Sequence, residues 1–286
     1  MSGGRAVSAI NARNIMLQSA TRGVAAIGQA FVILTAGIDL SVGGVALICC
    51  VVGTSLMTGT TGFPVGPVAI MLLLGIAMGA VNGFLVSRIG LPALIATLAM
   101  WQILDGAAFR VTKGMIIIGL PRVFTIVGQG YVGPMPVAAL IFIAVAVVAF
   151  IVLHYTSFGR SVYAVGGNAV SSWLSGINVK NTIFIVYVIS GFCGALAGII
   201  LSSRLMVGSL VVGAGLELDS IAAVCIGGVS LFGGRGTLVG VILGVFIISV
   251  INNGMNLMAL HSSYQSVVKG AIIISAVATD QLRRRR

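Results

Sequence analysis

The residues able to do acid–base or ion chemistry are few. The chain has 286 residues and only five Asp and Glu side chains, of which Asp39, Glu217 and Asp219 stand at the beginning of long apolar segments. Glu217 and Asp219 are two positions apart, so they cannot share one face of a helix, and a paired-carboxylate catalytic site is not expected. The GxxxxGK[ST] phosphate-binding loop is missing from the sequence. We therefore expect no catalytic residue and no ATP hydrolysis by this chain alone.

Asp39 and Asp219 allow two interpretations. Carboxylates inside an apolar protein are costly and usually functional. An Asp at the beginning of a helix also caps the first turn and interacts well with the helix dipole. We favour capping for both residues, and the two roles can coexist.

Polar side chains near these carboxylates are candidates for a hydrophilic path. Asn252, Asn253 and Asn256 lie close together in a late apolar segment, where they could bind a polyol or hold helices together. Neither alternative is preferred. The predicted path is formed by Asp39, Ser41, Asn82, Glu217, Asp219, Asn252 and Asn253. The four cysteines lie in apolar runs without metal-ligand spacing, so no metal and no cofactor are expected.

Composition places these residues in a membrane. Hydrophobic residues make up 58% of the chain and charged residues 7%, and the mean hydropathy is +1.17. Soluble domains carry about a quarter charged residues. The net charge of +11 does not indicate nucleic-acid binding, because the basic residues lie singly at the ends of apolar runs, apart from the cluster at residues 283–286. Such a tail is typical of the cytoplasmic end of a last helix.

The chain therefore has the pattern of an all-α polytopic membrane protein. Each span takes roughly 20 apolar residues, and we expect about nine transmembrane helices in one membrane domain over residues 14–282, after a short N-terminal segment at residues 1–13. A short seventh segment suggests a broken helix at a cavity. The expected spans are residues 15–36, 42–57, 68–86, 91–111, 137–153, 183–201, 218–231, 238–257 and 265–279.

The segment at residues 159–179, GRSVYAVGGNAVSSWLSGINV, interrupts the apolar pattern with glycines and polar residues. We interpret it as a cytoplasmic docking segment through which a soluble motor moves the membrane part. With this segment inside, more of the basic loop residues also fall inside, as the positive-inside rule requires. Nine spans then put the N-terminus outside, so we expect related chains to begin one helix earlier.

A weak internal repeat is also visible. Asp39 and Ser41 begin one segment and Asn82 closes the next, while Asp219 begins a later segment and Asn252 closes the one after it. By the predicted orientation the two copies are inverted, as in many transporters.

Several motifs along the chain resemble a known family. These are GQAFVILTAGIDLSVGG at residues 28–44, GRSVYAVGGN at 159–168, LSGIN at 174–178, GLELDSIAAVCIGGVSLFGGRG at 215–236 and NNGMNL at 252–257. Together they resemble the ribose-type permeases of the branched-chain amino acid/ribose permease family, the membrane subunits of bacterial ABC sugar importers. The similarity extends from about residue 14 to residue 280, and it implies ten helices in the family against nine here.

The resemblance implies partners and a mechanism. The expected partners are two cytoplasmic ABC ATPase domains, a periplasmic sugar-binding protein, a second permease subunit and the lipid bilayer of the bacterial inner membrane. The ATPase-coupling residues implied by the motif are Gly166, Gly167, Asn168, Ala169, Ser172, Gly176, Ile177 and Asn178. Ala169 stands where the family usually has an acidic residue, and Ile116 where it usually has a proline; these departures bear on ATPase docking and on contact with the binding protein.

The function expected from the resemblance is import of a monosaccharide or related polyol by alternating access. The alternative is an ion-coupled secondary carrier, which would need ionisable residues within the membrane. Asp39, Asp105, Glu217 and Asp219 are the candidates, and each lies near the end of a segment. A purely structural membrane scaffold would need neither broken segments nor a docking segment.

Overall fold

The computed structural model describes residues 8–284. Over this range the chain is almost entirely helical, and a two-stranded hairpin is its only sheet. The elements are α1 (Ala9–Leu34), α2 (Val42–Met57), α3 (Val65–Phe84) continued by a π-helical turn (Leu85–Ile89), α4 (Ala93–Thr112), a 3₁₀ turn (Arg122–Phe124), α5 (Thr125–Gln129), β1 (Tyr131–Val132), β2 (Met135–Pro136), α6 (Val137–Tyr155), α7 (Ser157–Gly167), α8 (Ala169–Leu174), α9 (Val179–Leu205), α10 (Leu216–Ile226), α11 (Leu238–Leu257) and α12 (Ser262–Arg284).

The predicted all-α polytopic fold is confirmed. Each of the nine expected segments corresponds to a helix, namely α1, α2, α3, α4, α6, α9, α10, α11 and α12. Within the described residues, five helices are long and apolar enough to cross a membrane: α3 with its π-helical turn, α4, α6, α9 and α11. Helix α2 is apolar but shorter, and α10 has only 11 residues. The predicted seventh span therefore ends earlier than expected, at Ile226 rather than at residue 231.

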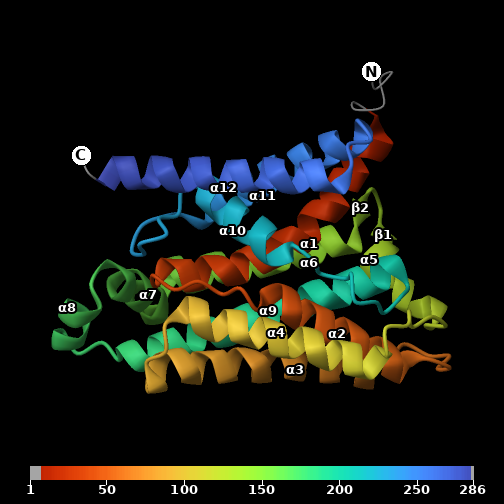
Figure 1. Ribbon diagram of the computed structural model, residues 1–286, viewed down its shortest axis with the longest axis horizontal. Helices are drawn as coiled ribbons and strands as arrows, with labels where there is room; N and C mark the ends of the chain where they lie inside the picture. Colours follow the sequence, from red (N-terminus) through yellow and green to blue (C-terminus); the bar gives the residue numbers. More distant parts are fainter. Residues whose placement is uncertain (1–7, 285–286) are drawn as a thin grey trace.

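The long helices lie roughly side by side, so the molecule has two opposite ends (Figure 1). One end carries α7 and α8, and the other carries α5 and the β1–β2 hairpin, in which Tyr131 pairs with Pro136. Helix α12 runs along one edge of the bundle and packs mainly on α10. Residues 285–286 of the predicted basic tail lie outside the described part of the chain.

Helix α9 forms the centre of the bundle. Its most apolar stretch is 61% buried, against 28% for α3, α4 and α6. Small residues make this possible, because glycines four apart let helix backbones approach closely. A Cβ added at Gly79 of α3 would collide with the Tyr187 carbonyl oxygen of α9, and one at Gly198 of α9 would overlap the backbone of Ala46.

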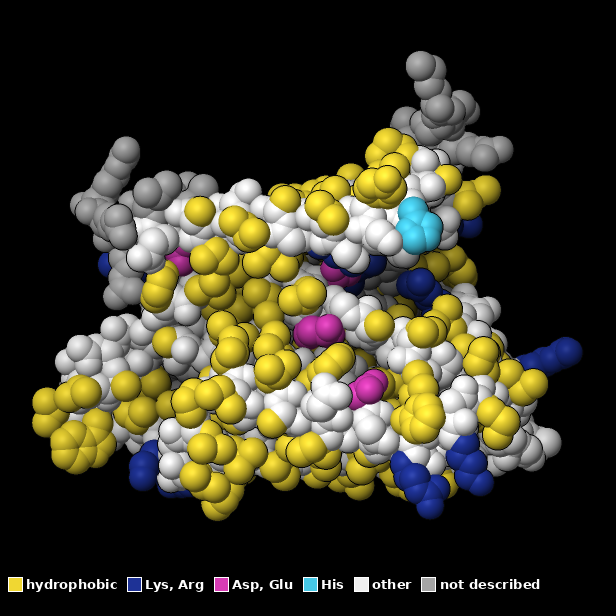
Figure 2. All heavy atoms as spheres, in the orientation of Figure 1, with side chains coloured by type: hydrophobic (Ala, Val, Ile, Leu, Met, Phe, Trp, Pro, Cys, Tyr) yellow, Lys and Arg dark blue, Asp and Glu magenta, His cyan; other side chains and the backbone are white. Residues whose placement is uncertain are grey.

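The glycine spacings thus serve helix packing. The same holds for Gly240 and Gly244 of α11, which lie against the backbone of α10 at Gly227 and Ala223. Many apolar side chains of α3, α4 and α6 remain exposed, as expected for helices that face lipid. Figure 2 shows hydrophobic side chains spread over this face, with basic side chains along its lower and right margins and a few of them farther in, beside acidic side chains.

Candidate functional site

Asp39 lies in the loop between α1 and α2 and is 1% exposed. Its Oδ1 accepts hydrogen bonds from the Ser41 backbone N–H (2.9 Å) and the Ser41 hydroxyl (2.6 Å), and its Oδ2 accepts one from the Ser190 hydroxyl of α9 (2.6 Å). The Asn82 amide of α3 donates to Ser41 Oγ at 2.7 Å. Protein donors therefore occupy both oxygens of the carboxylate, and the network ties α2, α3 and α9 together.

The N-cap of α2 is Ser41, without a side-chain cap bond, so the prediction that Asp39 caps this helix is wrong; Asp39 accepts from the N–H of Ser41 itself. The sequence did not indicate Ser190, because a single serine in an apolar helix gives no signal of its partner. The Gln29 side chain, with its amide turned to satisfy both groups, bonds the backbone N–H and C=O of Asp39 at 3.2 and 2.9 Å. Both carboxylate oxygens and both backbone groups of Asp39 are thus engaged within the protein, whereas the buried Oδ1 of Asn82 has no hydrogen-bond partner among the described residues.

Asp219 is the centre of a second cluster. Its carboxylate pairs with Arg22 of α1 (Nε to Oδ2, 2.8 Å) and with Lys269 of α12 (Nζ to Oδ1, 2.7 Å). The Asn252 amide of α11 donates to Oδ2 at 3.3 Å. The cap of α10 is Gly215, so the prediction that Asp219 caps this helix is wrong. Two cations from distant helices take its carboxylate instead.

Glu217 points away from that cluster, as the two-residue spacing requires. Its carboxylate lies over Gly43 in the first turn of α2, so closely that a Cβ at Gly43 would collide with it. Val42, Ala46 and Leu216 share one buried cluster, and the N-terminal ends of the short helices α2 and α10 therefore meet inside the bundle. Such ends carry partial positive charge and are typical of solute sites in transporters.

The predicted repeat has a structural counterpart. In each copy an Asn from the following helix donates to a polar side chain at the beginning of the short helix: Asn82 to Ser41, and Asn252 to Asp219. Asn253 does not join either cluster, because its amide donates to Asn11 of α1 at 2.8 Å.

A polar cavity of about 300 Å³ lies beside Asp219, among α1, α9, α11 and the loop before α10. Asp219 is the predicted path residue in its wall. Asn256, one of the three neighbouring asparagines, also lines the cavity. Arg22 and Arg204 line it too, but the sequence did not predict this, because their proximity depends on how α1 and α9 cross. The cavity is lined by Gln18, Thr21, Arg22, Leu201, Arg204, Leu205, Val211, Val212, Gly213, Ala214, Leu216, Asp219 and Asn256.

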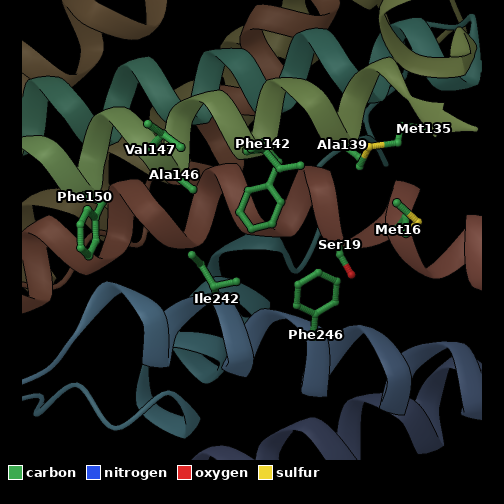
Figure 3. Close-up of a pocket in the computed structure, with 11 residues that line it drawn as sticks. Met16, Ser19, Met135, Ala139, Phe142, Ala146, Val147, Phe150, Ile242 and Phe246 are labelled. Carbon is green, nitrogen blue, oxygen red and sulfur yellow. The ribbon is translucent and has the colours of Figure 1, made fainter. Parts of the chain in front are cut away.

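A larger groove of about 430 Å³ between α1, α6 and α11 is chemically different (Figure 3). The rings of Phe142 and Phe246 flank it, with their centroids 6.5 Å apart, and its walls are apolar apart from Ser19. It offers almost nothing to a polar solute. The polar cavity is therefore the better candidate for a solute site.

The predicted docking segment folds into two short helices, α7 and α8, at one end of the molecule (Figure 1). Asn168 separates them, and its side chain caps α8 by accepting from the Ser171 N–H at 2.9 Å. Gly176 has φ +83° and permits the turn before Asn178, which caps α9 by accepting from the Asn181 N–H at 3.0 Å.

Gly166 fixes α7 to the membrane helices. A Cβ there would collide with the Leu34 carbonyl at the end of α1 and crowd Gly234 in the loop between α10 and α11. The Gly234 N–H donates to that carbonyl at 2.9 Å, and the Tyr163 hydroxyl donates to the Gly236 carbonyl at 3.1 Å. Burial raises the pKa of Tyr163, so the phenol stays a donor. Gly167, by contrast, has open space around it.

Helix α8 presents apolar side chains to solvent. Val170, Trp173 and Leu174 are 67–73% exposed, while Ser172 is buried and bonds the Asn168 carbonyl at 2.8 Å. A shallow groove beside α8 is lined by Ala169, Val170, Trp173, Gly176, Ile177 and Asn178, with Arg88 and Lys180 at its margin. The resemblance indicated the segment but not Trp173, whose exposure only the fold reveals.

Residues 11–277 match the family model described as the branched-chain amino acid transport system / permease component. The chain belongs to this permease family. The permease is 41% identical to the ribose import permease protein of Bacillus subtilis (strain 168) over 275 residues, which covers 95% of this chain and 85% of that protein. No solved structure matches it.

Permeases named for other sugars are also similar over nearly the whole chain. The D-allose transport system permease protein of Escherichia coli (strain K12) is 37% identical and covers 95% of this permease and 83% of its own length. The xylose transport system permease protein of the same strain is 34% identical, and the match covers 99% of this permease and 88% of that protein. The helical fold and the family together make this chain a multi-pass permease of a bacterial inner membrane.

Proposed function

We propose that this permease is the membrane subunit of an ATP-driven ABC importer for a monosaccharide or related polyol. The observation that carries the proposal is its similarity, along nearly the whole chain, to permeases named for ribose, D-allose and xylose. Transport would proceed by alternating access, which requires two packings of similar free energy. The polar cavity beside Asp219 and the meeting N-terminal ends of α2 and α10 are the proposed path.

The way α7 is attached supports an external drive. Gly166 lies against the end of α1 and against the loop that follows α10. Helices α1 and α10 are also joined to each other, because Arg22 of α1 pairs with Asp219 of α10. A push on α7 and α8 would therefore reach both sides of this ion pair. Asp280 of α12 also bonds the loop, through the Ser230 hydroxyl at 3.0 Å.

The surface of α8 suggests the chemistry of the ATPase that it meets. Trp173 and its apolar neighbours would enter a hydrophobic groove, and Arg88 and Lys180 would face acidic groups at its margin. Charged groups at such a margin set approach and orientation more than affinity. Ala169 leaves this face without the acidic residue usual in the family, which fits a more acidic partner groove.

The remaining partners follow from the architecture of the importer. Two ATPase domains would bind the α7–α8 ends of two permease subunits. A sugar-binding protein would meet the opposite end, where the 3₁₀ turn exposes Arg122.

Reconstituted vesicles test this function. The permease, its ATPase and its binding protein should take up sugar only when ATP is present, and an ionophore that collapses ion gradients should leave uptake unchanged. Uptake that persists without nucleotide and stops with the ionophore would establish the ion-coupled carrier instead.

A further inference from the structure

The polar cavity beside Asp219 has more positive than negative charge. Arg22, Arg204 and Asp219 line it, and Lys269 reaches the same carboxylate from α12. Asp219 is already bound by Arg22, Lys269 and Asn252. Glu217 lies over Gly43 of α2 and is not part of this wall, so three cations face one carboxylate here.

Arg204 is the group left uncompensated. It lies in the last turn of α9 and is half-buried. Its backbone carbonyl accepts from Gln129 at 2.8 Å, but its guanidinium has no ion-pair or hydrogen-bond partner among the described residues. The end of a helix favours a cation, yet here a second guanidinium, that of Arg22, lines the same cavity. Two like charges in a partly desolvated cavity are unfavourable unless an anion joins them.

We propose that this cavity binds the carboxylate of the transported solute, so that the permease carries sugar acids such as aldonates or uronates. This inference rests on the proposed import function and narrows its substrate class. The planar fork of Arg204 matches a carboxylate in bidentate geometry. Gln18, Thr21 and Asn256 supply donors and acceptors for the hydroxyl groups of the sugar. A volume of about 300 Å³ is at the small end of ligand sites and suits a monosaccharide.

Ligand binding measured in the absence of the sugar-binding protein tests the proposal, because the selectivity observed is then that of the permease. The assembled permease and ATPase are placed in nanodiscs of phosphatidylcholine, and binding of radiolabelled gluconate and glucose is measured. We expect saturable gluconate binding that glucuronate displaces and glucose displaces at least tenfold less well. Arg204→Gln should weaken gluconate binding about tenfold or more, the loss of one charge-assisted contact. Arg204→Lys should bind gluconate with intermediate affinity, because lysine keeps the positive charge but lacks the planar guanidinium that bonds both carboxylate oxygens.

Arg110→Gln is the matched control, since Arg110 is an exposed arginine in the last turn of α4. It should bind gluconate like the parent protein. Arg204→Gln must also melt at the parent temperature, so that a binding loss is not a folding loss. Equal binding of glucose and gluconate, or unchanged gluconate binding in Arg204→Gln, would overturn the proposal. ATP-driven uptake of neutral sugar would still leave the import function standing in that case.

The anion that pairs with Arg204 could instead be the phosphate of a lipid headgroup. Nanodiscs that contain phosphatidylglycerol distinguish a lipid phosphate from the carboxylate of a solute. If native mass spectrometry finds phosphatidylglycerol retained by the parent protein and lost in Arg204→Gln, and gluconate no longer binds, the cavity is a lipid site and the solute assignment is overturned. Unchanged gluconate binding in these nanodiscs supports the solute assignment.

Discussion

Asp219 joins three helices through one carboxylate. Arg22 of α1 and Lys269 of α12 both reach it within 2.8 Å, and its side chain is 7% exposed. Breaking a buried ion pair leaves unpaired charge behind, which costs far more than the pair contributes on its own. Since α12 packs mainly on α10, this carboxylate also fastens the C-terminal helix to the bundle.

Replacing Asp219 by Asn tests that role. The substitution removes the charge and leaves Arg22 and Lys269 facing each other, so we expect a loss of about 1–3 kcal/mol in stability, discounted because both cations are partly exposed. Thermal unfolding in detergent should show a melting temperature lower by several degrees. Asp105→Asn is the control, because Asp105 is half-buried in α4 and forms no ion pair within residues 8–284. An unchanged melting temperature in Asp219→Asn would contradict the role.

Short helices decide where polar groups can lie in this bundle. Helices α2 and α10 begin inside it, at Val42 and Leu216. Asp39 and Ser41 lie just before α2 and Asp219 lies in the first turns of α10, and all three side chains are buried. Irregular backbone at that depth is tolerated only where protein or a cavity covers it. Helix α8, by contrast, is a short helix whose apolar side chains Val170, Trp173 and Leu174 are exposed.

Trp173 provides the test of α8 as a docking element. It is 67% exposed, so Trp173→Ala should leave the melting temperature unchanged but remove an aromatic anchor of the kind that dominates interfaces. We expect at least tenfold weaker ATPase association, measured by titrating the purified ATPase onto the permease in nanodiscs. Tyr264→Ala is the control, because Tyr264 is 66% exposed and lies in the first turn of α12, outside α8. Equal losses in both variants would argue against docking through α8.

The two ends of the whole molecule are built from different elements (Figure 1). Helices α7 and α8 form one end, and residues 113–136 with the β1–β2 hairpin form the other. The predicted orientation puts α8 in the cytosol, as an ATPase-coupled mechanism requires.

Thiol labelling tests this orientation. In a variant whose four native cysteines are replaced, Ser171→Cys on α8 should react with a membrane-impermeant reagent only after the cells are opened, because it lies in the cytosol. Thr125→Cys, near the opposite end, should react in spheroplasts that are still intact. Labelling of Ser171→Cys from outside would reverse the orientation and exclude the coupling mechanism.

The sequence by itself determined the helices and the position of the polar segment that separates α6 from α9. Apolar runs set the spans, and the polar, glycine-rich composition of residues 159–179 marks the interruption between them, because both depend on neighbours within a few residues. Only the tertiary structure decided the partners of the carboxylates. Arg22 and Asp219 are 197 positions apart, and Ser190 and Arg204 acquire their roles from the crossing of α9 with α1 and α2. A local pattern contains no information on such crossings, so capping was expected at Asp219 where the fold forms an ion cluster.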